Sequence, residues 1–217
     1  MLKLYSRLTI VLFIVTSCAS KKAKYEDYVF KTRTEEVKYQ AAYDKALKLW
    51  NIPYNEEDVK TNFGTAHVVI AGPKNGKSLV LLHGMDASST MWYPNIQVLA
   101  KNHRIYAIDF IMEPNKSNLT AKPLSSDDIV VFYNEIFDHY KLRKFDIIGA
   151  SRGGWIATLL AIQKPNSIDK IVLLSPAQTF KFLDKPRKTT SALLLKLFPS
   201  EKKFSKTLNT FSAHPEN

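Results

Sequence analysis

The residues with the clearest chemical signature are a serine and the glycines around it. The segment reads Gly149-Ala150-Ser151-Arg152-Gly153-Gly154. An apolar run precedes it at residues 145–148, and a run of small and apolar residues follows it at residues 153–163. A serine held at strained backbone angles on a strand-to-helix turn needs small neighbours. The pattern therefore predicts that Ser151 is a nucleophile that attacks an acyl carbon, with the positive end of the following helix directed at the developing oxyanion.

A second segment lies upstream and also follows an apolar run: Leu81-Leu82-His83-Gly84-Met85. Together the two segments resemble the α/β-hydrolase family, in which a His-Gly loop follows the third strand and the serine turn is called the nucleophile elbow. The resemblance implies that the backbone N–H groups of Met85 and Arg152 donate to the oxyanion. Losing one such donor typically costs about 10²–10³-fold in rate. We expect His83 to hold the loop and not to act as the base.

A third match begins at Asp109 and resembles the family stretch Asp-x-x-Gly-x-Gly-x-Ser. Met112 and Asn115 stand where glycines are common. Asparagine tolerates left-handed backbone angles, so the change at Asn115 is expected to be small, whereas Met112 leaves the shape of this loop open. The three motifs occur in family order, and the resemblance covers about residues 60–180.

The partners that a serine nucleophile needs are not evident. Attack requires a histidine to take the proton and an acid to orient that histidine. The family order is serine, acid, histidine, with the acid after the seventh strand and the histidine after the eighth, beyond a lid. Only His214 follows Ser151, in a polar tail where we expect a terminal residue without a catalytic role, and the downstream aspartates are Asp169 and Asp184. Besides His83, three histidines precede the serine and would break the family order: His67, His103 and His139.

We therefore expect this chain to be the N-terminal part of a longer hydrolase, or the product of a truncated gene, in which the C-terminal strands are missing. The predicted function is serine hydrolysis of carboxylic esters or related acyl substrates, without metal or cofactor. Whether the chain is itself an enzyme stays open. The alternatives are a catalytically inactive fragment, a pseudo-hydrolase that only binds, and, among enzymes, a proline iminopeptidase-like or haloperoxidase-like activity.

The first residues have the features of a secretory signal. Positive residues precede a short apolar run, residues 8–15, which is too short to span a bilayer. Residues 15–18 resemble a bacterial lipobox, and Cys18 is the single cysteine. The sequence predicts a signal peptide over residues 1–17, lipidation of Cys18 and a lipoprotein anchored to a membrane of the cell envelope. The alternative is a plain signal peptide and a secreted protein.

Composition restricts the partners. The chain has 217 residues, 45% of them hydrophobic and 24% charged, with a net charge of +11. This is the composition of a folded domain. The lysines are scattered and do not form a basic patch interleaved with aromatic residues, so nucleic acid is not an expected partner. The expected partners are a small ester or acyl substrate and, through the anchor, a membrane.

The elements that must position the serine alternate along the chain. Apolar runs predict strands at residues 66–70, 79–82, 105–108, 145–148 and 171–174, and helical patterns cover residues 35–50, 93–101, 125–140 and 153–163. This alternation predicts an α/β fold, a mostly parallel sheet with helices on both faces. We divide the chain into a signal peptide (1–17), a tether and helix (18–60), the N-terminal half of a hydrolase core (61–180) and the start of a lid (181–217).

The first helix is predicted from apolar residues that are mostly three, four or five positions apart, with lysines between them: Val37, Ala41, Ala42, Ala46, Leu47 and Trp50. Residues 72–78 resemble a phosphate-binding loop, but the spacing is one residue short and Ala71 replaces the required glycine. We predict a hairpin turn there.

Overall fold

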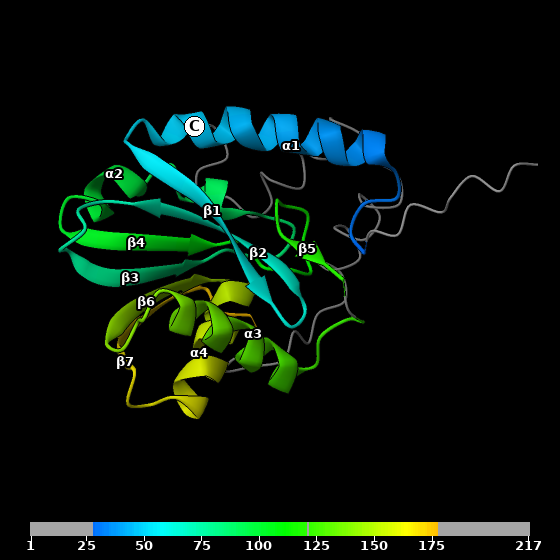
Figure 1. Ribbon diagram of the computed structural model, residues 1–217. Helices are drawn as coiled ribbons and strands as arrows, with labels where there is room; N and C mark the ends of the chain where they lie inside the picture. The colour runs from blue at the N-terminus through cyan, green and yellow to red at the C-terminus, as the bar shows by residue number, and fades with distance from the viewer. Residues whose placement is uncertain (1–27, 121, 178–217) are drawn as a thin grey trace, which may run out of the picture.

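A mixed, mostly parallel sheet lies at the centre of the structure (Figure 1). The computed structural model describes residues 28–120 and 122–177. The strands lie in the order β1 (Tyr54–Thr61), β2 (Gly64–Ala71), β4 (His103–Ile108), β3 (Lys77–Leu82), β6 (Phe145–Ala150) and β7 (Ile168–Leu174), with the short β5 (Asn118–Leu119) beside β2. β1 and β4 pair with β2 in antiparallel fashion, and the pairs from β4 through β3 and β6 to β7 are parallel. The predicted fold class is confirmed.

Helices cover both faces of this sheet (Figure 1). The helices are α1 (Arg33–Leu47), α2 (Ile96–Leu99), α3 (Ser126–His139) and α4 (Arg152–Gln163), with 3₁₀ turns at Lys48–Trp50 and Ser89–Trp92. In β3, Leu79 and Leu81 pack in the core under α1 and α2, and Val80 and Leu82 pack in the core under α3 and α4. Because both faces are buried, β3 is a continuous apolar run. Within the described residues, no helix is both long and apolar enough to cross a membrane.

The predicted helix forms, but of the apolar side chains in its pattern only Leu47 and Trp50 are buried. Val37, Ala41 and Ala42 are exposed, and the buried side is formed by Glu36, Tyr43 and Leu47, with Trp50 in the following 3₁₀ turn. Burying large aromatic side chains removes far more apolar surface from water than burying alanines. Tyr43 and Trp50 therefore decide which side of α1 faces the sheet.

The sheet begins earlier than the sequence predicts. β1 starts at Tyr54, within the residues for which the sequence predicts only a tether and a helix. Only Val59 of this strand is buried, so it has no apolar pattern to detect. Its stability comes from pairing with β2 along its full length, from Tyr54 opposite Ala71 to Thr61 opposite Gly64.

The predicted hairpin at residues 72–78 is also wrong. A turn does form there, since the Gly76 N–H donates to the Pro73 carbonyl oxygen (N···O 3.0 Å). The strands on either side of it, however, are not neighbours, because β4 lies between β2 and β3. A hairpin turn joins adjacent antiparallel strands, whereas this turn joins strands separated by a third.

The start of α3 follows the sequence closely. The Ser125 hydroxyl accepts the Asp128 N–H (3.2 Å), and the Asp128 carboxylate accepts the Ser125 N–H (2.9 Å). These two bonds form a capping box. The hydrogen bonds from the Ser125 backbone and hydroxyl lower the pKa of the Asp128 carboxyl.

Candidate active site

Ser151 lies on a strained turn between β6 and α4. Its backbone angles are φ 50° and ψ −111°. A non-glycine residue keeps such angles only where its surroundings fix them. The Ser151 N–H donates to the Leu174 carbonyl of β7 (2.9 Å), and its own carbonyl accepts N–H groups of Gly154 (3.1 Å) and Ala177 (2.9 Å). The ends of two strands and the start of a helix thus hold the serine at the carboxyl edge of the sheet.

The glycines of this turn lie where the backbone approaches other atoms most closely. A Cβ added to Gly149 would lie 2.3 Å from the Gly153 carbonyl oxygen, and one on Gly153 would lie 2.1 Å from the Leu82 carbonyl oxygen. At Gly154 the added atom would be 2.8 Å from the Pro176 Cβ. No side chain fits at these distances without movement of the backbone. The glycines therefore bring the start of α4 against the end of β3.

The His-Gly loop lies beside Ser151. An added Cβ on Gly84 would lie 3.5 Å from the Ser151 Cβ. His83 is buried; its Nδ1–H donates to the Gly84 carbonyl (2.8 Å), and its Nε2 accepts the Phe110 N–H (2.8 Å). This pairing requires the neutral ring protonated at Nδ1. Burial lowers the pKa of His83. With both ring nitrogens engaged, His83 joins the loop to the segment after β4.

The two N–H groups that the sequence suggests as oxyanion donors are available. Arg152 is the first residue of α4, and Met85 follows Gly84 in the loop. Among the described residues, neither backbone N–H has a hydrogen-bond acceptor. The first N–H groups of a helix lack partners within that helix and carry partial positive charge. A negative oxygen at this turn would therefore find two donors that no group in the described part of the chain uses.

The sequence reasoning overlooked Glu113. This residue is 3% exposed, and its carboxylate accepts the Asp86 N–H (3.0 Å) and pairs with the Arg152 guanidinium. Burial lowers the pKa of Arg152. The signal available in the sequence was a glutamate directly after the apolar stretch Phe110-Ile111-Met112. Its partners lie far away in the sequence, so the pattern alone could not reveal them.

Asn115 has a different role from the one expected. It is not among the residues with positive φ, so the left-handed backbone that asparagine tolerates is not used there. Instead its Nδ2 donates to the Phe110 carbonyl (2.8 Å) and its Oδ1 accepts the Ser117 N–H (2.7 Å). The buried side chain closes the loop after β4. Met112 packs against the core, and its sulfur accepts the Leu124 N–H (3.3 Å).

Asp109 stands at the start of that loop and is fully buried. Its carboxylate accepts the Ser89 N–H (2.7 Å) and, more weakly, the Lys116 N–H (3.4 Å). Asp109 therefore joins the loop to the 3₁₀ turn that follows the His-Gly loop.

The acid and the histidine of a triad are not found near Ser151 among the described residues. Asp169 lies near the start of β7, where it pairs with Lys77 (3.2 Å) and Lys144 (3.8 Å), whereas the other end of β7 meets Ser151. Asp184 and His214 lie outside the described residues. No described histidine is hydrogen-bonded to Ser151. The part of the chain that the structure describes also holds no cluster of His, Cys, Asp and Glu suited to a metal ion.

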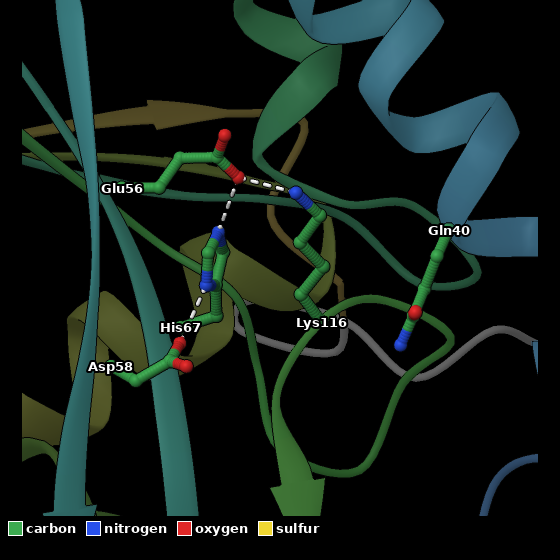
Figure 2. Close-up of a pocket in the computed structure, with 5 residues that line it drawn as sticks. All are labelled: Gln40, Glu56, Asp58, His67 and Lys116. Atoms are coloured by element: carbon green, nitrogen blue, oxygen red, sulfur yellow. Dashed lines mark hydrogen bonds and ion pairs between the residues drawn. The ribbon is translucent and has the colours of Figure 1, made fainter. Parts of the chain in front are cut away.

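His67 is engaged in a separate cluster. Its ring lies between Asp58 (2.7 Å) and Glu56 (3.0 Å), both on β1, as Figure 2 shows. Lys116 pairs with the same Glu56 carboxylate (2.5 Å). With Gln40 of α1, these residues line a cavity of about 410 Å³. The charged groups of this cluster are paired with one another. Both ring nitrogens of His67 are hydrogen-bonded to carboxylates, so His67 is not available as a base for Ser151.

Known proteins share this architecture. A family model described as the alpha/beta hydrolase fold matches residues 77–211. The chain is 36% identical over 144 residues to carboxylesterase YbfK of Bacillus subtilis, covering 66% of this chain and 49% of YbfK. The crystal structure of YbfK covers 73% of this chain and 56% of its own, with a TM-score of 0.70 and 33% identity.

The crystal structure of naproxen esterase from Bacillus subtilis is also similar. It has a TM-score of 0.75 at 33% identity and covers 80% of this chain and 59% of its own. The chain spans about half the length of the curated relatives that it matches.

Proposed function

Because the chain belongs to the α/β-hydrolase fold family and is carboxylesterase-like, we propose that the protein is a serine hydrolase of carboxylic esters or related acyl compounds. The observation that carries the proposal is the position of Ser151. It lies on a strained turn, against the His-Gly loop and next to two N–H groups without acceptors among the described residues.

In the proposed reaction, the Ser151 Oγ attacks the carbonyl carbon of the ester and loses its proton to a base. The carbonyl oxygen becomes an oxyanion and accepts the N–H groups of Met85 and Arg152. The carbon–oxygen bond to the alcohol then breaks, and the alcohol leaves with the proton from the base. Water attacks the acyl-serine by the same route and releases the acid. None of the described histidines is hydrogen-bonded to Ser151, so the proposal assigns the base to a histidine of the full-length gene product that lies outside the described residues.

A fluorophosphonate probe tests this assignment in the full-length gene product. The wild type is expected to be labelled and Ser151→Ala is not, because the probe forms a covalent bond only with an activated serine. Ser78→Ala is the control, since Ser78 is half-buried at the opposite end of β3 and should not change labelling. Equal labelling of wild type and Ser151→Ala would overturn the proposal. A folded wild type that neither reacts with the probe nor hydrolyses p-nitrophenyl esters would favour a binding-only protein.

We also propose that Cys18 carries a lipid and anchors the protein to a membrane of the cell envelope. The support is the sequence alone: a short apolar run, small residues and then the only cysteine. Cys18 lies outside the described residues.

A further inference from the structure

One buried carboxylate connects the two segments of the oxyanion hole. Glu113 Oε2 accepts the N–H of Asp86, the residue after Met85. Its other oxygen, Oε1, pairs with the guanidinium of Arg152, the residue after Ser151. The Met85 donor lies in the loop after β3 and the Arg152 donor lies at the start of α4. Glu113, from the loop after β4, is thus bonded to both segments.

The backbone at Asp86 needs such a bond. Its φ is 53°, in the left-handed region that non-glycine residues seldom adopt. Strained backbone persists where neighbouring groups fix it. The hydrogen bond to Glu113 fixes the Asp86 N–H, and the peptide that joins Met85 to Asp86 is thereby held. The Met85 N–H belongs to the peptide unit directly before the one that is held.

The charges of the pair compensate each other. A buried carboxylate without a partner would be costly, and its negative charge would oppose an oxyanion nearby. The Arg152 guanidinium neutralises it and also lies 5.8 Å from the centre of the Phe110 ring. Glu113 can therefore accept the Asp86 N–H without placing an unpaired negative charge beside the hole.

We propose that Glu113 is a positioning residue that holds the N–H donors of Met85 and Arg152 in one arrangement for the oxyanion. This role rests on the proposed function of Ser151. Glu113 does not touch the reacting atoms and acts through Asp86 and the Arg152 side chain. Its removal should weaken an interaction made in the transition state and leave binding of the substrate nearly unchanged.

The test compares Glu113→Ala and Glu113→Gln with wild type in the full-length gene product. Glu113→Ala is expected to lower kcat by about 10–100-fold at nearly unchanged KM, a loss at or below that of one oxyanion donor. Glu113→Gln keeps a carbonyl oxygen for the Asp86 N–H and should recover part of the rate. Asp146→Ala is the matched control, because it removes a half-buried carboxylate paired with Lys77 near the start of β6, at the opposite end of that strand from Ser151. It should leave kcat unchanged.

A second measurement does not depend on activity. Hydrogen exchange of a peptide spanning residues 84–86 should be faster in Glu113→Ala than in wild type, with no change in Asp146→Ala. Unchanged exchange, or a loss of kcat no larger than in the Asp146 control, would overturn the positioning role. Faster exchange together with equal probe labelling of wild type and Ser151→Ala would support the role of Glu113 in holding the loop and refute the proposed function of Ser151. The two failures are therefore distinguishable.

Discussion

At the scale of single residues, the turn around Ser151 depends on buried polar side chains that are all hydrogen-bonded. Four of them are at most 3% exposed: His83, Asp109, Glu113 and Asn115. Each is hydrogen-bonded to a backbone group in its own loop or in a neighbouring loop. A buried polar group without a partner costs about 1–3 kcal/mol. Each of these residues therefore stabilises one geometry of its loop, and together they fix the surroundings of Ser151.

His83 should make the stability of the protein depend on pH. Burial lowers its pKa below the usual 6.5, partly offset by the charge of Asp109. The unfolded state then binds the proton more readily, so the contribution of His83 is fully present above the unfolded pKa and is lost as the pH falls through the lower folded value. The free energy of unfolding should fall between about pH 7.5 and about pH 5.5, and this fall should be smaller in His83→Gln.

Urea unfolding at both pH values measures this difference. His139→Gln serves as the control, because His139 is exposed at the end of α3, and it should keep the wild-type pH dependence. An identical fall in wild type and His83→Gln would show that another group carries the effect.

At the scale of elements, the contact between the start of α4 and the end of β3 places Ser151 beside the His-Gly loop. Gly153 is the point of closest approach, against the Leu82 carbonyl. The same parallel arrangement brings the carboxyl ends of β3, β6 and β7 to one edge of the sheet, which is where α/β proteins bind their ligands. The site is thus a consequence of how β6 and α4 pack on their neighbours.

Gly153→Ala should test this contact. Glycine to alanine inside a helix normally stabilises by about 1 kcal/mol. Here the added methyl would lie 2.1 Å from the Leu82 carbonyl oxygen, so the change should lower the free energy of unfolding by about 1–3 kcal/mol. The matched control is Gly84→Ala, whose added atom would make an ordinary contact at 3.5 Å, and its unfolding should stay close to wild type. Denaturant unfolding of both variants measures the change in the free energy of unfolding. A Gly153→Ala variant that is more stable than wild type would contradict the close packing.

At the scale of the whole molecule, two cores on opposite faces hold the sheet, and the site lies at its edge. One core joins the sheet to α1 and α2, and the other joins it to α3 and α4. The chain carries a net charge of +11. On the proposed anchor, a basic protein would be held near a membrane surface, where anionic lipids attract lysine and arginine.

The anchor proposal predicts that Cys18→Ala loses its lipid. The wild type expressed in a bacterial host should incorporate labelled palmitate and partition with membranes, and Cys18→Ala should do neither. Ser20→Ala, just beyond the lipobox-like residues, is the control and should behave as wild type. Palmitate labelling that persists in Cys18→Ala, or its absence from the wild type, would contradict the anchor.

The sequence by itself determined the features that depend on neighbouring residues. The small residues around Ser151 require a tight turn, the apolar runs require buried strands, and the capping box at Ser125 starts a helix. Each of these is settled within a few residues along the chain, so the α/β-hydrolase fold and the position of its serine turn could be predicted.

Only the tertiary structure decided the features that depend on distant residues. The polar strand β1 exists because β2 lies beside it, and β4 separates the strands around the turn at residues 72–78. α1 faces the sheet through Tyr43 and Trp50 and not through its alanines. Glu113 gains its role from Asp86 and Arg152, which the fold brings to it across 27 and 39 residues of sequence. Pairing and burial between distant segments leave no periodic pattern along the chain, and this is why they emerged only in three dimensions.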